Sequence, residues 1–120
     1  MTERLVRLKT RADFLRVAAA RARAVRTGLV LQASAQPGDR GARPRVGFTA
    51  SRRVGNAVAR NRAKRRLRAV AAAVLPVKGR DGMDYVLIAR AGTGERLYAK
   101  LVGDLEGALR QVSRPGRREE

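Results

Sequence analysis

Hydrophobic positions recur along the chain with two periods, which predict where strands and helices lie. Residues 29–35 and 45–51 alternate in steps of two, as half-buried strands do. Residues 84–90 are more apolar and predict a more buried strand. Apolar side chains spaced three to four residues apart predict one helix over about 56–75 and a closing helix that ends near residue 112.

The residues between these segments predict where the helices begin and end and where the loops lie. Thr10 and Asp13 form a capping-box pattern, which predicts a helix over about 11–25, and Gly28 ends that segment. The central helix should stop before Pro76, because proline disfavours helical geometry in the residue that precedes it. Segments rich in glycine and proline predict loops at 36–44 and 76–83.

The resulting element order, α-β-β-α-β-α, predicts a single domain over residues 1–120 with an α+β sandwich fold. Residues 1–9 would be a loose basic segment, with Leu5 and Leu8 touching the body, and residues 113–120 a flexible tail. Strand parity divides the sheet into two faces. The expected core face carries Leu29, Leu31, Ala33, Val46, Phe48, Ala50, Tyr85, Leu87 and Ala89.

The charge of the chain narrows the class of partner. The 28 Lys and Arg residues outnumber the 10 Asp and Glu residues, so the formal net charge is +18. A net charge of this size is informative about the binding partner rather than about the fold, and phosphate-rich nucleic acid is the expected partner. A membrane surface is the other candidate, but there is no signal-peptide-like run and no stretch long enough to span a bilayer.

Much of this charge lies in residues 51–68, where eight of eighteen side chains are basic and none is acidic. At 100° per residue, the apolar side chains of this helix fall on one side. Arg62, Arg65, Arg66 and Arg68 fall on the far side and its flanks. Arg60 falls nearer the apolar side and should point along the groove beside the helix. Without acidic neighbours such a run repels itself unless an anion binds it, although many charge runs are simply solvated.

Catalytic groups are scarce. The sequence has no His and no Cys, which excludes imidazole and thiol chemistry and leaves the redox compartment open. The ten acids are scattered, whereas a metal-dependent nuclease needs clustered carboxylates. An intrinsic nuclease remains a minor alternative, since folding could gather some of these acids.

Three stretches of the chain form recognisable motifs. The main one runs Gly55-Asn56-Ala57-Val58-x-Arg60-Asn61-Arg62-x-Lys64-Arg65-x-x-Arg68, after the lead-in Val46-Gly47-Phe48-Thr49-Ala50-Ser51-Arg52-Arg53. The others are Arg4-Leu5-x-x-Leu8-Lys9-x-x-x-Asp13-Phe14 and Asp84-Tyr85-Val86-Leu87-Ile88-Ala89-Arg90. Together these stretches resemble the bacterial ribonuclease P protein family, and the resemblance covers residues 4–110 in the family's order.

This resemblance implies a two-layer α+β sandwich like the second domain of ribosomal protein S5, in which helices pack on a mixed sheet. It also implies a left-handed β-α-β crossover around the central helix, although the general rule gives the opposite hand. The implied function is that of the protein subunit of ribonuclease P, which removes the 5′ leader from precursor tRNA. The RNA subunit would hold the Mg²⁺ ions and hydrolyse the bond, so no catalytic residue, metal site or protein-bound cofactor is expected in this chain.

The expected partners are the catalytic RNA subunit and precursor tRNA, with no membrane and no further protein required. A cytoplasmic location is expected from the RNA partner and the lack of targeting signals. By the resemblance, the motif region should contact the RNA subunit through Arg52, Arg53, Asn56, Arg60, Asn61, Arg62, Lys64, Arg65 and Arg68. The outer arginines could instead be solvated, and Gly55 could serve only as a turn.

A second site is implied between the first helix and the sheet, where the family holds the single-stranded leader. The residues expected there are Phe14, Val30, Gln32, Thr49, Ser51, Ile88 and Arg90. Phe14 could equally be core, whereas Tyr85 has the opposite parity and is assigned to the core. Ala18 and Gln32 stand where the family often has aromatic residues, so stacking on the leader would be weaker here.

Two rival functions use the same charge differently. A ribosomal or other structured-RNA protein would bind RNA without assisting cleavage. A basic helix for a membrane surface or a calmodulin-type partner would leave the alternating strands unexplained.

Overall fold

In the computed structural model, which describes residues 5–38 and 43–112, the alternating segments build one mixed sheet. Its strands are β1 (Val6–Arg7), β2 (Ala22–Val25), β3 (Leu29–Ala35), β4 (Arg45–Thr49) and β5 (Met83–Ala89). They lie in the order β1-β4-β5-β3-β2. β4 is parallel to both β1 and β5, whereas β3 is antiparallel to β5 and β2.

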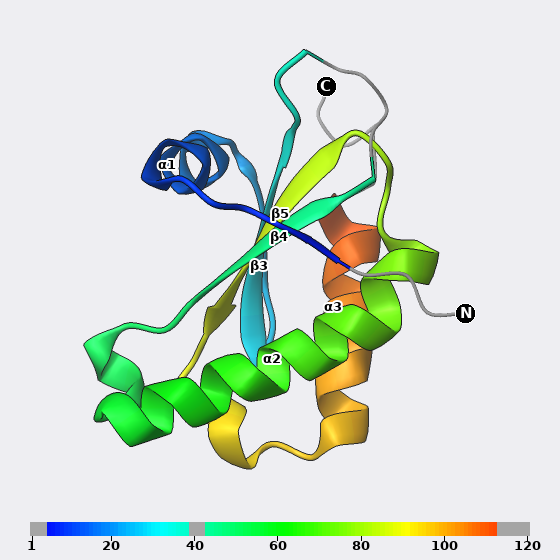
Figure 1. The fold of residues 1–120 in the computed structure, drawn as a ribbon. Coiled ribbons are helices and arrows are strands. Elements are labelled where there is room, and N and C mark those ends of the chain that lie inside the picture. The colour runs from blue at the N-terminus through cyan, green and yellow to red at the C-terminus, as the bar shows by residue number, and fades with distance from the viewer. Residues whose placement is uncertain (1–4, 39–42, 113–120) are drawn as a thin grey trace.

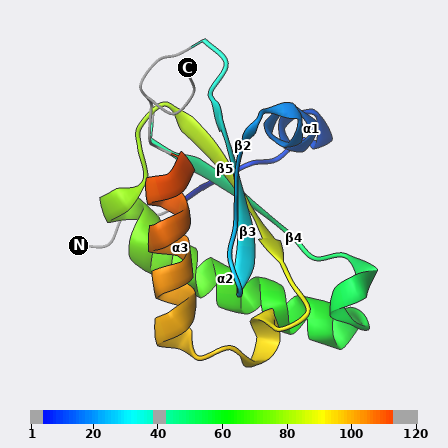
Figure 2. The ribbon, with the colours of Figure 1, turned by 180° about the vertical axis from the view of Figure 1, so that it is seen from behind.

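Helices pack on both faces of this sheet (Figures 1 and 2). α1 (Arg11–Ala19) lies on one face, while α2 (Ala57–Lys78) and α3 (Tyr98–Val112) lie on the other. The predicted α+β class, with helices packed on a mixed sheet, is confirmed. β4 and β5 are parallel neighbours joined through α2, and the left hand of this crossover stays a prediction.

Strand parity predicted the two faces correctly. On the side of α2 and α3, the alternate residues of β3 and β5, such as Leu31 and Leu87, are fully buried in the main core together with Leu67 of α2. Tyr85 is also fully buried there, as expected. On the side of α1, a smaller cluster forms around Val17 and Val86. The two clusters fix α2 and α1 on opposite sides of the same strands.

The prediction of one helix over residues 11–25 was wrong in its second half. α1 ends at Ala19, and residues 22–25 form strand β2, which pairs with β3. Alanine and arginine are good helix formers, but here they alternate, and Ala24 is fully buried in the main core. The Arg26 N–H donates to the Leu29 carbonyl at 2.8 Å and closes the hairpin. With β1 included, the element order is β-α-β-β-β-α-β-α.

The N-terminal segment is not loose where the structure describes it. Val6–Arg7 pairs with the start of β4, and Leu8 is buried while its N–H donates to the Val46 carbonyl at 3.0 Å. Edge pairing and burial of Leu8 therefore order a segment whose basic composition predicted mobility. The remaining predictions for residues 1–4, 39–42 and the tail 113–120 lie outside the described residues.

The central helix does not stop before Pro76. α2 continues to Lys78, because Val74 and Leu75 are buried and the missing proline N–H removes one bond near the helix end. The Gly79 N–H donates to the Leu75 carbonyl at 2.8 Å and ends the helix. The predicted loop over 76–83 is correspondingly shorter. The strand predicted for 45–51 ends at Thr49, and the chain then turns toward α2.

Candidate nucleic-acid interface

A short turn directs the basic motif away from the sheet. After β4, the side chain of Ser51 accepts a hydrogen bond from the Arg53 N–H at 3.3 Å at the start of the short 3-10 turn η1 (Arg52–Val54). Gly55 follows with φ of 142°, a conformation that side-chain-bearing residues rarely adopt. Asn56 then caps α2, its Oδ1 accepting from the Ala59 N–H at 2.9 Å. Ser51 and Asn56 thus have local structural roles besides those predicted for them.

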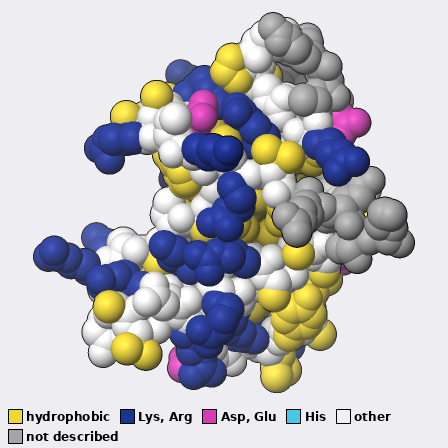
Figure 3. All heavy atoms as spheres, viewed as in Figure 1, with side chains coloured by type: hydrophobic (Ala, Val, Ile, Leu, Met, Phe, Trp, Pro, Cys, Tyr) yellow, Lys and Arg dark blue, Asp and Glu magenta, His cyan; other side chains and the backbone are white. Residues whose placement is uncertain are grey.

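α2 separates its side chains by burial. Ala63, Leu67 and Val70 are fully buried against the sheet and α3. Among the residues predicted to contact an RNA subunit, those exposed are Arg52, Arg53, Asn56, Asn61, Arg62, Arg65 and Arg68, and Lys64 is half-buried. Basic side chains gather over α2 and extend toward α1, with few acids among them (Figure 3). Within the described residues, the ion pair on α2 joins Lys78, at its far end, to Glu106 at 3.7 Å.

Two arginines of α2 bind backbone carbonyls of the protein. Arg60 is half-buried and its Nη1 donates to the Gly55 carbonyl at 2.8 Å. As predicted, its side chain therefore does not point straight out from the helix. Arg66 was assigned to the exposed side, yet it is half-buried and Nη1 donates to the Thr93 carbonyl at 2.7 Å. Thr93 belongs to the short turn η2 (Thr93–Glu95), which lies against α2. Arg66 therefore anchors this turn.

The second predicted site lies on the face of the sheet that α1 partly covers. Thr49, Ile88 and Val30 are in register across β4, β5 and β3, and Gln32 belongs to the adjacent row. Val30 and Gln32 are buried, whereas Thr49 and Ile88 are half-buried. The structure therefore brings four of the seven predicted leader-binding residues onto one surface. Figure 3 shows the molecule hollowed between α1 and the beginning of α2.

Phe14 of α1 borders this surface. Its ring lies directly on Gly47 of β4, since a Cβ at that position would overlap two ring carbons. Phe14 is half-buried and packs against the small cluster that contains Val17 and Val86. This position fits both roles considered for the residue, because the ring contributes to packing and keeps part of its surface exposed.

The last two predicted residues lie just beyond the strand ends. Ser51 is exposed and its Oγ accepts the η1 hydrogen bond, while Arg90 is exposed and Nη1 donates to the Arg26 carbonyl. Arg90 is therefore held at the turn between β2 and β3 rather than free to extend across the sheet.

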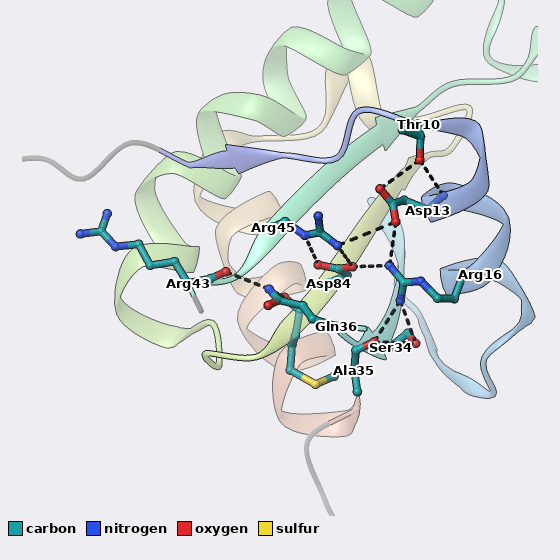
Figure 4. A network of polar contacts seen from close by, with 10 residues as sticks. Thr10, Asp13, Arg16, Ser34, Ala35, Gln36, Arg43, Arg45 and Asp84 are labelled. Atoms are coloured by element: carbon teal, nitrogen blue, oxygen red, sulfur yellow. Dashed lines mark hydrogen bonds and ion pairs between the residues drawn. The ribbon is translucent and has the colours of Figure 1, made fainter. Parts of the chain in front are cut away.

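A buried carboxylate, for which the sequence predicted no role, holds α1 in place (Figure 4). Asp84 of β5 is fully buried and accepts two hydrogen bonds from Arg45 of β4, at 2.8 and 2.7 Å. It also accepts from Arg16 of α1, whose other guanidinium nitrogen donates to the Ala35 carbonyl at 3.0 Å. The signal in the sequence was an acid within an apolar strand, on the parity that faces α1.

Charges in this network support one another. The hydrogen bonds that Arg45 donates to Asp84 raise the pKa of Arg45, and the hydrogen bond from Arg16 is the largest influence lowering the pKa of Asp13. Because the pKa of Asp13 is lowered in the folded state, its contribution to stability is present above the ordinary value of 3.8 and is lost as the pH falls below it. The network thus joins α1, β3, β4 and β5 through charge-assisted hydrogen bonds.

Carboxylates are otherwise sparse. Within residues 5–38 and 43–112, no three His, Cys, Asp or Glu side chains lie close enough to form a metal site. Asp84 and Asp13 face arginines, and Asp104 accepts hydrogen bonds from the Gly28 N–H and from Arg96. None of the described helices is long and apolar enough to cross a membrane.

Known proteins are similar to this chain both in sequence and in fold. The family model described as Ribonuclease P matches residues 2–113. The chain belongs to the ribonuclease P protein family. A ribonuclease P protein component from Paramagnetospirillum magneticum is 52% identical over 114 residues, covering 93% of this chain and 86% of the relative. Another, from Caulobacter vibrioides, is 49% identical over 108 residues, covering 90% of this chain and 71% of the relative.

Solved structures of ribonuclease P proteins agree with the fold. The Staphylococcus aureus protein aligns with a TM-score of 0.71 at 25% identity, over 89% of this chain and 94% of that one. The Thermotoga maritima protein aligns with a TM-score of 0.69 at 24% identity, over 95% and 98% of the two chains. A ribonuclease P protein is one subunit of a ribonucleoprotein that matures tRNA 5′ ends, so this chain has an RNA partner, as its charge predicted.

Proposed function

We propose that this ribonuclease P protein binds a catalytic RNA subunit and the 5′ leader of precursor tRNA, and that the RNA performs the cleavage. The observation that carries the proposal is the exposed basic surface of α2. Asn61, Arg62, Arg65 and Arg68 are exposed there, and none has a carboxylate partner among the described residues. Arginine can bind a phosphate through two parallel hydrogen bonds, and asparagine can donate to phosphate or sugar.

The RNA-subunit surface in this proposal continues beyond the helix face into the preceding turn. Its members are Arg52, Arg53, Asn56, Arg60, Asn61, Arg62, Lys64, Arg65 and Arg68. Gly55 permits the turn that places η1 beside the start of α2. Because Arg60 already donates one hydrogen bond to the protein, it would contribute fewer donors than Arg62.

The leader would lie across the surface between α1 and the sheet. Ile88 and Thr49 are partly exposed and supply an apolar and a hydroxyl side chain, and the partly exposed Phe14 packs against the same small cluster as Ile88. Single-stranded RNA is commonly bound by aromatic stacking together with basic side chains. Val30, Gln32, Ser51 and Arg90 complete the proposed leader site.

Magnesium would be held mainly by the RNA subunit. Mg²⁺ prefers carboxylate and phosphate oxygens, and the described part of the chain gathers no carboxylate cluster for it. The protein would act by screening phosphate repulsion and by holding the substrate, in the cytoplasm and without a further protein. The metal ions would supply the chemistry of hydrolysis within the RNA subunit, while these side chains would bind and orient the RNA and the substrate.

Reconstitution tests this division of roles. Purified protein, freed of nucleic acid, should cleave no precursor tRNA, whereas its addition to a cognate catalytic RNA should lower the Mg²⁺ concentration needed for cleavage. The Arg62→Ala, Arg65→Ala double variant should lose much of this effect. The Lys100→Ala, Arg110→Ala pair makes the same charge change on exposed positions of α3 and serves as the control.

Two results would contradict the proposal. Site-specific cleavage by the RNA-free protein would place catalysis in the polypeptide. No effect on the RNA reaction across a Mg²⁺ titration would favour a structured-RNA protein outside this pathway.

A further inference from the structure

Two arginines from distant parts of the chain meet over one aromatic ring. Phe48 of β4 faces α2 and is 8% exposed. The guanidinium carbon of Arg7, in β1, lies 5.4 Å from the ring centroid, and that of Arg68, in α2, lies 6.0 Å from it. Pairing of β1 with β4 brings Arg7 beside Phe48, and the packing of α2 on the sheet brings Arg68.

The guanidinium groups have no other partner in the described structure. Both side chains are exposed, and no carboxylate or carbonyl within the described residues accepts a hydrogen bond from either. A ring face attracts a guanidinium only weakly at an exposed site, so it positions the two groups without neutralising them. Two like charges held within about 6 Å of one point repel each other unless an anion lies between or beside them.

We propose that Arg7 and Arg68, positioned by Phe48, form a binding site for the phosphate backbone of the RNA subunit. A cation–π contact uses the charge of a guanidinium but none of its N–H donors, so the donors of both arginines remain available for bidentate binding of phosphate. The inference rests on the proposed function of α2 and extends its RNA-binding surface across β1. It adds Arg7, which sequence analysis did not assign to a site.

The position of Phe48 selects the RNA subunit over the leader as the source of the phosphate. Phe48 lies on the face of the sheet that carries α2, whereas Phe14 and Ile88 lie on the opposite face. Arg68 projects from the same helix as Arg62 and Arg65, so one RNA helix bound along α2 would reach the site.

Binding of the protein to the isolated RNA subunit, measured over a series of salt concentrations, tests the site. Arg7→Ala should weaken binding three- to tenfold and reduce the slope of log K against log salt by about 1, because one fewer counterion is released. Arg110→Ala, which removes an exposed charge from α3, should change both much less. Circular dichroism and thermal unfolding check that each variant is folded.

A double-mutant cycle separates the role of the ring from that of charge. Phe48→Leu keeps an apolar side chain in the core but removes the ring face, and it should weaken binding two- to fivefold. In the Arg7→Ala, Arg68→Ala background the same change should have no effect on binding. Arg7→Lys keeps the charge and should retain the salt slope while recovering only part of the affinity.

The possible outcomes distinguish failure of the Arg7–Arg68 site from failure of the proposed function on which it rests. If wild-type protein fails to bind the RNA subunit, the proposed function fails and the site with it. If wild-type protein binds and Arg7→Ala behaves like Arg110→Ala, only the site is overturned. A loss confined to the preference for leader-bearing over mature tRNA would assign the two arginines to the leader and would also overturn the proposal.

Discussion

Neighbouring arginines on α2 serve different purposes. Arg65 is exposed and has no partner among the described residues, whereas Arg66 donates to the Thr93 carbonyl. The Thr93 hydroxyl in turn donates to the Gly28 carbonyl at 2.7 Å, so Arg66 helps to connect α2 with the turn before β3. A helical wheel cannot separate the two residues, because the difference depends on where η2 comes to lie.

We expect Arg65→Ala and Arg66→Ala to have opposite profiles. Arg65→Ala should lower the salt slope of RNA binding by about 1 and leave the free energy of unfolding within about 0.5 kcal/mol of wild type. Arg66→Ala should cost about 1–2 kcal/mol of stability, since it leaves a carbonyl without its charged donor, and should change the salt slope less. Denaturant unfolding and RNA titrations check both. Equal salt slopes in the two variants would show that Arg66 also contacts RNA.

Phe14 is the residue on which the leader site depends most. Phe14→Ala should reduce the preference for leader-bearing over mature tRNA several-fold, because the ring beside Ile88 is lost. Leu15→Ala, on the same helix at a position that is 56% exposed, should not. Competition binding with the two tRNAs measures the preference. Unfolding of Phe14→Ala with no selective loss would assign the residue to the core alone.

At the scale of elements, the sequence was most informative where burial imposes a strict pattern. β3 and β5 are largely buried on both faces, and the alternation in residues 29–35 and the apolar run in residues 84–90 predicted them to within a residue. β2 is an edge strand whose alanines and arginines fit a helix equally well, and only the burial of Ala24 beneath α3 decides between the two. The same applies to Pro76, where packing of Leu75 outweighs a local preference.

α1 is held by few apolar contacts and by the ion network around Asp84. Asp84→Asn should therefore destabilise the protein by about 3 kcal/mol, the lower end for breaking a buried pair, because both arginines are 29% exposed. Asp81→Asn, at an exposed position in the loop before β5, is the control and should be nearly neutral. Chemical denaturation gives the free energies, and hydrogen exchange should show faster exchange in α1. Unchanged exchange in α1 would exclude this positioning role.

At the scale of the whole molecule, the candidate site depends on how the topology of the fold brings distant segments together. Sequence periodicity placed Arg62, Arg65 and Arg68 on the exposed side of α2 and predicted the shared parity of Val30, Thr49 and Ile88, and the structure confirms both. The sequence pattern could not show that Arg90 and Arg66 donate hydrogen bonds to backbone carbonyls, or that Arg7 lies beside the ring of Phe48. Those contacts join segments distant in sequence, and no local pattern encodes them.

Global stability should depend on pH through Tyr85. Burial raises the pKa of this phenol above its ordinary value of 10.0, and its oxygen accepts the Arg80 N–H at 3.0 Å. Because the pKa is raised in the folded state, this contribution to stability is complete below pH 10 and is lost as the pH rises beyond it. Tyr85→Phe should cost about 1 kcal/mol at pH 7, and its deficit relative to wild type should shrink toward pH 11.

Unfolding free energies measured from pH 7 to pH 11 check this expectation. Tyr98→Phe, at a position that is 45% exposed, is the matched control and should follow the wild-type curve. Parallel curves for wild type and Tyr85→Phe would mean that ionisation of this phenol does not limit alkaline stability.

Internal pairing of the acids has a practical consequence. Asp13, Asp84, Asp104 and Glu106, four of the described acids, each face an arginine or lysine of the same molecule, and the full chain carries a formal net charge of +18. Two copies of such a polypeptide repel each other, while any stray polyanion in a cell extract adheres to it. Preparations should therefore be washed in concentrated salt and checked for absorbance at 260 nm before any affinity is assigned.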